Sequence, residues 1–141
     1  MKNKNKIRVA VLMGGPSAEH DISLATGEKV LESLDKEKYA PKAVVISKKG
    51  KWPITLAKLK ENFDVAFIAM HGEYGEDGQV QKILEKADIP YTGSDSRASE
   101  IGMDKAVSAG YFEKAGLRTP KFTLLTIKDP KKIGLEQIRF V

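Results

Sequence analysis

Cysteine is absent from the 141-residue sequence, which excludes disulfide scaffolds, thiolate metal sites and cysteine nucleophiles. No apolar run approaches the roughly 18 residues that a membrane-spanning helix needs. The polar, basic residues 1–6 resemble neither a signal peptide nor a transit peptide. Aromatic residues are scarce at 7%, against 41% hydrophobic residues, so the composition allows one domain-sized core rather than two large ones. These absences predict a soluble cytoplasmic protein without a membrane partner.

The charge balance is basic, with 24 lysine and arginine residues against 19 acidic ones and a formal net charge of +5. A nucleic-acid binder is therefore an alternative to weigh. Arginine, the better reader of bases, occurs only at positions 8, 97, 118 and 139. Basic residues do not form a stripe interleaved with aromatic ones, as they do in single-strand binders. We expect solvated lysine faces and no nucleic-acid partner.

Apolar runs and helical periodicities alternate along the chain. Short apolar runs predict strands at 7–13, 42–47, 63–70, 89–92 and 122–127. Helical spacing predicts helices from Ser17 to Leu34, over 80–87, and as two pieces within 94–114. This alternation favours an α/β fold, with an open, mostly parallel sheet and helices on both faces.

Local signals predict where several of these elements begin and end. Ser17 is a good N-cap, and Glu19 would lie in the first turn, where the helix dipole favours an anion. Asp104 is the predicted cap of the last helical piece, and Gly116 its stop signal. Trp52-Pro53 could begin a short edge segment. Residues 134–141 read as the approach to a further strand, so we expect the chain to be part of a longer protein.

Two glycine-rich loops, residues 14–20 and 71–78, follow predicted parallel strands. Ligands of open α/β sheets bind beyond the carboxyl ends of such strands, and glycines let backbone approach a ligand closely. The first loop also opens a helix whose free N–H groups could hold an anion. Each loop taken alone could equally be an ordinary capped turn.

Known phosphate and metal motifs do not account for these loops. The first lacks the G-x-G-x-x-G fingerprint of dinucleotide-binding domains, and the chain contains no G-x-x-x-x-G-K-[ST] phosphate loop. The spacing of the acids near His71, namely Glu73, Glu76 and Asp77, matches no zinc or calcium pattern, so no metal site is predicted. Glu76 and Asp77 are expected to hold their own loop in shape.

Taken together, the loops resemble the signatures of one family, the D-alanine–D-alanine ligases. Residues 14–24 (GGPSAEHDISL) resemble the first signature and residues 71–81 (HGEYGEDGQVQ) the second. Tyr91–Ser94 followed by Met103–Lys105 is similar to a third landmark, and residues 116–120 (GLRTP) to the linker into the ATP-grasp part. Two departures are Pro16, in place of a polar or basic residue, and Lys82, in place of a small one.

The resemblance implies a reaction in which ATP phosphorylates the carboxylate of one D-alanine and the amine of a second attacks the acyl phosphate. By the same resemblance, Glu19 would hold the ammonium group of the first D-alanine. His71 would contact its carboxylate and the acyl phosphate, and Lys105 would reach the phosphates of ATP. The first loop would add further substrate-binding positions, namely Gly14, Gly15 and Ser17.

The resemblance also implies how the chain is organised. Residues 1–103 would form a Rossmann-like, substrate-binding pre-ATP-grasp domain, and residues 104–141 the incomplete start of an ATP-grasp domain. The sites for ATP and Mg²⁺ would lie mainly in a part that the sequence does not contain, so the chain alone should be inactive. A homodimer that makes the dipeptide for peptidoglycan is expected. The alternative is a stand-alone ligand-binding or regulatory module that kept the fold.

Overall fold

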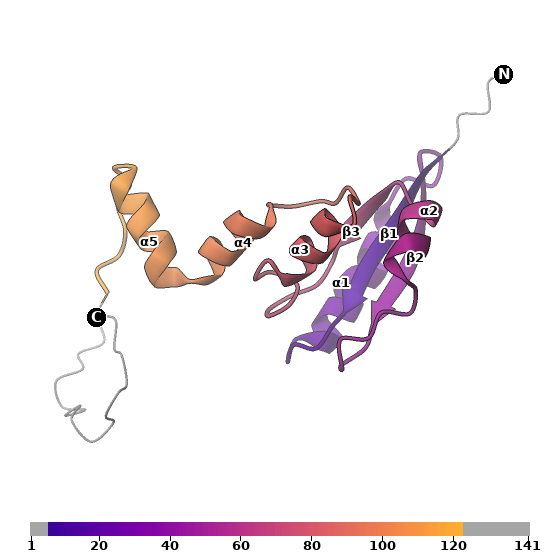
Figure 1. Ribbon diagram of the computed structural model, residues 1–141, viewed down its shortest axis with the longest axis horizontal. Helices are drawn as coiled ribbons and strands as arrows, with labels where there is room; N and C mark the ends of the chain where they lie inside the picture. Colours follow the sequence, from indigo (N-terminus) through magenta and orange to yellow (C-terminus); the bar gives the residue numbers. More distant parts are fainter. Residues whose placement is uncertain (1–5, 123–141) are drawn as a thin grey trace.

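The computed structural model describes residues 6–122, which form an α/β arrangement around one parallel sheet (Figure 1). The strands are β1 (Ile7–Gly14), β2 (Tyr39–Ile46) and β3 (Val65–Ile68), in the order β2-β1-β3. The helices are α1 (His20–Ser33), α2 (Leu56–Asn62), α3 (Gln79–Lys86), α4 (Ser96–Met103) and α5 (Lys105–Lys114). The predicted fold class is confirmed.

Strand β1 lies in the centre of the sheet and pairs in parallel with both neighbours. It is buried from Val9 to its end, as its continuous apolar run predicts. Strand β2 begins three residues before the predicted strand, and it tolerates Pro41 because it is an edge strand. The fourth predicted strand, 89–92, is reduced to a parallel bridge between Tyr91 and Ala66.

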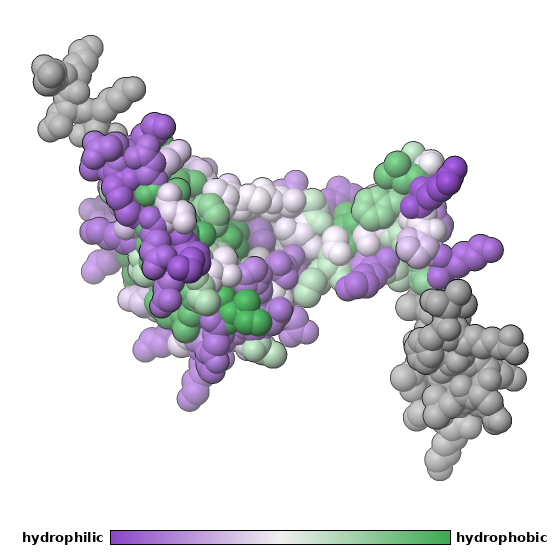
Figure 2. Space-filling view, turned by 180° about the vertical axis from the view of Figure 1, so that it is seen from behind, coloured by the Kyte–Doolittle hydropathy of each residue, from purple (hydrophilic) through white to green (hydrophobic). Residues whose placement is uncertain are grey.

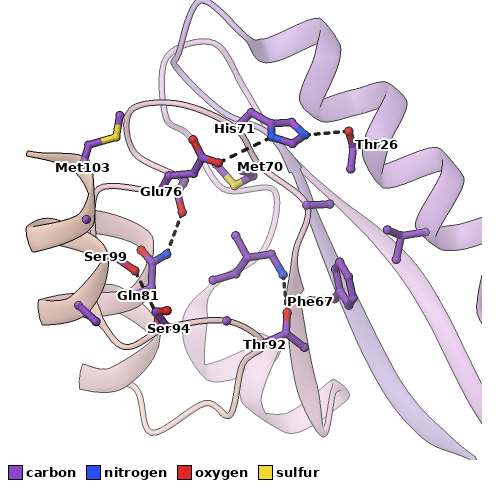
Figure 3. Close-up of a pocket in the computed structure, with 17 residues that line it drawn as sticks. Thr26, Phe67, Met70, His71, Glu76, Gln81, Thr92, Ser94, Ser99 and Met103 are labelled. Atoms are coloured by element: carbon purple, nitrogen blue, oxygen red, sulfur yellow. Dashed lines mark hydrogen bonds and ion pairs between the residues drawn. The ribbon is translucent and has the colours of Figure 1, made fainter. Parts of the chain in front are cut away.

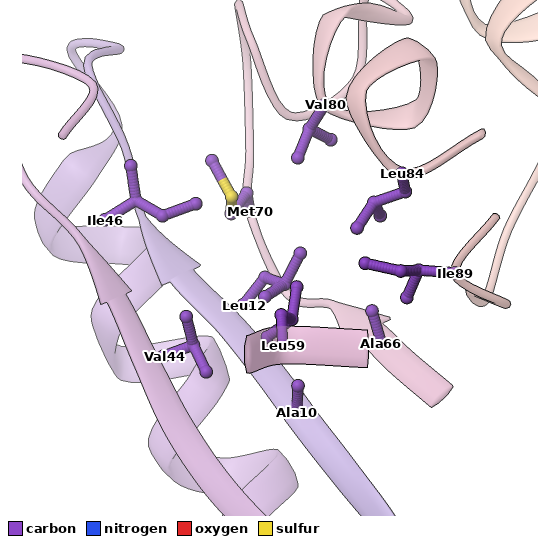
Figure 4. Packing of buried hydrophobic residues seen from close by; sticks show 10 residues of the cluster. All are labelled: Ala10, Leu12, Val44, Ile46, Leu59, Ala66, Met70, Val80, Leu84 and Ile89. Atoms are coloured by element: carbon purple, nitrogen blue, oxygen red, sulfur yellow. The ribbon is translucent and has the colours of Figure 1, made fainter. Parts of the chain in front are cut away.

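Helices cover both faces of the sheet, as predicted. On one face α1 packs Val30 and Leu31 against β1, together with its C-cap residue Leu34. On the other face α2 and α3 close a larger core (Figure 4), which contains Ala10, Leu12, Val44, Ile46, Leu59, Ala66, Met70, Val80, Leu84 and Ile89. Burial of the apolar side chains on both faces holds the carboxyl edge of the sheet in place.

The structure corrects three predictions about local elements and shows one helix that was not predicted. Helix α1 begins at His20 rather than directly after Ser17, and Glu19 is its N-cap residue, without a side-chain capping bond. Helix α2 was not predicted, because seven residues with few apolar positions give little periodicity. Trp52 and Pro53 lie in no strand. Strand β3 is also shorter than 63–70, since the Phe63 N–H ends α2 by donating to the Leu59 carbonyl.

Helices α4 and α5 extend away from the sheet (Figure 1). The side chain of Asp104 caps α5 by accepting hydrogen bonds from the N–H groups of Ala106 and Val107, which confirms the predicted cap. Gly116, at φ +76°, follows the last residues of α5, which confirms the predicted stop. Apart from Phe122, the predicted strand at 122–127 and the pattern at 134–141 lie outside the described residues.

Candidate functional site

The two glycine-rich loops meet at the carboxyl edge of the sheet, because β1 and β3 are parallel neighbours. The hydroxyl of Ser17 joins them by donating a hydrogen bond to the His71 carbonyl (2.9 Å) while accepting one from the Glu19 N–H (3.0 Å). Ser23 of α1 accepts a hydrogen bond from the His71 N–H (2.9 Å). Both backbone polar groups of His71 are therefore held from the first loop and its helix.

The carboxylate of Glu19 lies directly against Gly72, the first residue after His71. Gly72 adopts φ +71°, and a β-carbon there would collide with a Glu19 carboxylate oxygen. The positive φ favours glycine at this position, and the absence of a side chain lets the carboxylate lie against the backbone. The second loop thus contacts the Glu19 carboxylate at Gly72, the residue next to His71.

Two neighbouring cavities open at this edge. Glu19 lines the smaller, of about 420 Å³, together with Ser17, Gly72 and Glu73. His71 lines the larger, of about 610 Å³, between α1, the second loop and α4. Met103, the last residue of α4, borders both cavities. The structure therefore brings the two loops to one edge but places Glu19 and His71 in adjoining cavities rather than in a single one.

The His71 imidazole is held between two side chains (Figure 3). Its Nε2 lies 2.8 Å from the Thr26 hydroxyl of α1, and its Nδ1 lies 3.8 Å from a carboxylate oxygen of Glu76. The other Glu76 oxygen accepts a hydrogen bond from the Gly72 N–H (2.7 Å). The His71 side chain is 36% exposed, so a ligand can reach the ring from the cavity.

Several backbone groups of the first loop are already paired. The Gly15 N–H donates to the Ile46 carbonyl (2.8 Å), and the His20 N–H donates to the Ser17 carbonyl (3.2 Å). The buried imidazole of His20 donates from Nδ1 to the Gly15 carbonyl (2.5 Å). The N–H groups of Gly15 and His20 therefore have protein partners and are not free to bind an anion.

Asp77 holds the second loop in shape, as predicted for it. It accepts hydrogen bonds from the N–H groups of Tyr74 and Gln79 (both 3.0 Å) and from the Gln79 side chain (2.7 Å). Burial alone would raise the pKa of Asp77, but these hydrogen bonds outweigh it and the pKa lies below its ordinary value. A lowered pKa suits a loop-fixing role for Asp77 rather than proton transfer at neutral pH.

Lys105 lies apart from both cavities, as the exposed first residue of α5. Asp104 already occupies the neighbouring N–H groups at the start of this helix. Within residues 6–122 no group of three or more histidine, aspartate or glutamate side chains is placed to hold a metal ion. In that same range no helix is both long and apolar enough to cross a bilayer.

Sequence reasoning missed the side chains of His20, Ser23 and Thr26. Ser23 and Thr26 follow Glu19 by four and seven residues, which is the spacing of one helix face. That pattern could have shown that this face of α1 turns toward the loops. Nothing in the sequence marked His20, because its contact with Gly15 depends on how the loop folds back.

An α/β domain with two linked glycine-rich loops at the carboxyl edge of a parallel sheet belongs to the class that binds small ligands at that edge. Within that class, the family model described as the D-ala D-ala ligase N-terminus matches residues 8–61 and 53–94. The chain belongs to this family.

Named relatives are D-alanine–D-alanine ligases. The ligase of Pelotomaculum thermopropionicum is 43% identical over 130 residues, which cover 92% of this chain and 40% of that protein. The ligase of Citrifermentans bemidjiense is 46% identical over 129 residues, with 92% and 41% covered. The chain thus spans about two fifths of the length of these relatives.

Solved structures of ligases share the fold. The Coxiella burnetii D-alanine-D-alanine ligase superposes with a TM-score of 0.81 at 24% identity, covering 94% of this chain and 47% of that one. The Bacillus anthracis ligase complexed with ATP superposes with a TM-score of 0.71 at 36% identity, covering 91% and 45%.

Proposed function

We propose that this chain is the part of a D-alanine–D-alanine ligase that receives the first substrate. Joined to an ATP-grasp part, it would form the D-alanyl-D-alanine dipeptide for peptidoglycan through an acyl phosphate. The observation that carries the proposal is the Ser17–His71 hydrogen bond, which joins the loop of Glu19 to the loop of His71, where the Glu19 carboxylate lies against Gly72. Family membership and the ligase relatives support it.

The reaction needs an anion for the substrate ammonium and a donor for the oxygens that gain charge. Glu19 is exposed and rests on a fixed loop, so its carboxylate is suited to the ammonium group of the first D-alanine. His71 is suited to the substrate carboxylate and, after phosphoryl transfer, to the acyl phosphate. A substrate that bridges these two groups would cross the boundary between the adjoining cavities, past Met103.

ATP is the proposed phosphoryl donor, and Lys105 is the residue of this chain proposed to contact its phosphates. One exposed lysine does not make a nucleotide site, and residues 6–122 offer no metal-binding cluster. Mg²⁺ and most of the ATP contacts therefore belong, in this proposal, to the ATP-grasp part. The domain division at 103/104, a homodimer and a cytoplasmic location complete the proposal.

The role of Glu19 is tested in a chimera that joins residues 1–103 of this chain to the remainder of the Bacillus anthracis ligase. Glu19→Gln removes the charge and keeps the shape, so we expect a KM for the first D-alanine at least about tenfold higher, the effect of losing one hydrogen bond to a charged group. Phosphate release at varied D-alanine measures it. Glu28→Gln, an exposed position on the same helix, is the matched control.

Two results would contradict the proposal. One is a Glu19→Gln chimera with the kinetics of the unmodified chimera. The other is a properly folded chimera with no ligase activity at all, which would favour a stand-alone binding module.

The 141-residue chain by itself should release no phosphate from ATP in the presence of D-alanine.

The role of Lys105 is tested in a second chimera that carries residues 1–122. Lys105→Ala should raise the KM for ATP and leave the KM for D-alanine unchanged, because a single cation on the phosphates is lost. Lys114→Ala, at the other end of α5, is the control. An unchanged KM for ATP would remove Lys105 from the site.

A further inference from the structure

The contact between Thr26 and His71 is unusual for a threonine inside a helix. A threonine hydroxyl in a helix interior commonly turns back to a carbonyl of the preceding turn. Here the Thr26 hydroxyl lies 2.8 Å from Nε2 of His71, a residue 45 positions away on another element. The hydroxyl can serve as donor or as acceptor, so it does not by itself decide which ring nitrogen carries the proton.

Glu76 favours one ring nitrogen over the other, because the negative charge of a carboxylate attracts an N–H group and repels a ring lone pair. Nδ1 of His71 faces a Glu76 oxygen at 3.8 Å, across the upper part of the larger cavity (Figure 3). The neutral ring is therefore stabilised with its proton on Nδ1. Nε2 then offers a lone pair, and Thr26 donates its hydroxyl hydrogen to it. At 3.8 Å the Nδ1–H group makes no hydrogen bond to Glu76 and stays available to a ligand.

Close packing of α1 on the sheet brings Thr26 within reach. The next residue, Gly27, is buried against Met13 of β1, and a β-carbon at position 27 would lie 2.6 Å from the Met13 β-carbon. Only glycine permits this separation of helix and strand. The sequence Thr26-Gly27 thus combines a hydrogen-bonding group with the close approach that it needs.

We propose that Thr26 is a positioning residue, which holds Nε2 of His71 as an acceptor so that His71 presents its Nδ1–H to an anionic oxygen in the larger cavity. The identity of that anion, the carboxylate or acyl phosphate of the substrate, rests on the proposed function. The orientation and the tautomer of the ring do not, and they can be measured on this chain alone.

The test is the tautomer of His71 in the ¹⁵N-labelled 141-residue chain, read from long-range ¹H–¹⁵N correlations above the pH at which the shifts stop changing. The chain has only two histidines, His20 and His71, and a His71→Gln sample assigns the signals. We expect the wild-type ring of His71 to carry its proton on Nδ1. A wild-type ring protonated on Nε2 would overturn the proposal without any variant.

Variants separate positioning from mere packing. Thr26→Val keeps the shape and removes the hydroxyl, so the ratio of the Nδ1–H to the Nε2–H form should fall about three- to tenfold, the effect of losing one hydrogen bond. Thr26→Ser should keep the wild-type ratio. Ser99→Ala, which lines the same cavity without a hydrogen bond to His71, is the control. An unchanged ratio in a folded Thr26→Val chain would overturn the proposal.

Glu76→Gln tests the same assignment from the other side of the ring, should Thr26→Val not fold. The glutamine amide can donate to Nδ1, so the Nε2–H form should become populated; a ratio that stays at the wild-type value would count against the proposal. The two proposals can fail separately. If His71 carries its proton on Nδ1 in the 141-residue chain but the folded chimera has no ligase activity, the proposed function is refuted and the role of Thr26 stands.

Discussion

The sheet with its first three helices and the pair α4–α5 differ in how they bury apolar side chains. Leu12, Leu59 and Leu84 of the first region are completely buried. In α5, Val107, Tyr111 and Phe112 are 44–51% exposed, and Figure 2 shows apolar atoms at the surface of this part. The comparison shows that the sheet region completes its own core, while α5 adds almost nothing to it.

Within the second region, α4 lies nearer the sheet than α5, and polar contacts join it to the first region. Glu85 of α3 accepts hydrogen bonds from the Tyr91 hydroxyl (2.6 Å), the Ser96 N–H (2.9 Å) and the Ser96 hydroxyl (2.7 Å). Lys82 of α3 forms an ion pair with Glu100 of α4 (2.7 Å). These contacts keep α4, and with it Met103, at the border of both cavities. The proposed domain division at 103/104 falls directly after this helix.

The largest expected contrast is in stability. Leu12→Ala removes a fully buried side chain from the centre of the sheet and should lower the free energy of unfolding by about 2–5 kcal/mol. Phe112→Ala, at a half-exposed position of α5, should change it by less than about 0.5 kcal/mol. Urea unfolding of both variants measures the difference. Equal losses would mean that α5 shares the core of the sheet.

A smaller effect is expected from acid at the start of α4. Hydrogen bonds from Tyr91, and then from Ser96, hold the pKa of Glu85 below its ordinary value. Because the folded-state pKa is lowered, the stabilising contribution is complete above the unfolded pKa and is lost as the pH falls through the folded one. The protection of the Ser96 amide from hydrogen exchange, relative to its intrinsic rate at each pH, should therefore fall in that window.

Glu85→Gln supplies the matched comparison for this pH dependence. The variant should show lower protection at Ser96 at neutral pH and no further loss of protection in acid, because the titrating group is gone. The Ser99 amide, which donates to the Asp95 carbonyl within the same helix, reports whether all of α4 loosens. An acid response that persists in Glu85→Gln would assign it to another carboxylate.

The smallest effect is expected from Lys82. Its ion pair with Glu100 joins two half-exposed side chains, and exposed pairs of this kind contribute little. Lys82→Ala should leave the urea midpoint unchanged within error, with Lys86→Ala as a control on the same helix. A clear loss of stability that disappears in high salt would show that the pair anchors α4 as firmly as Glu85 does.

Much of the fold was predictable because its signals are local. The buried run of β1, the Asp104 cap and the Gly116 stop each depend on a few neighbouring residues, and the structure confirms them. Helix α2 was not predicted because its seven residues, of which only Leu59 is buried, give little periodicity. Ser17 looked like an N-cap, yet its hydroxyl contacts the second loop, a partner that no local pattern indicates.

The sequence alone determined the α/β class and the two glycine-rich loops, together with the family resemblance that those loops carry. These follow from periodicity, from residue types and from the order of motifs along the chain. Only the tertiary structure decided that Glu19 and His71 lie in adjoining cavities, and that Thr26 reaches the imidazole. Such contacts depend on side-chain distances across parallel strands and a closely packed helix, which residue order does not specify.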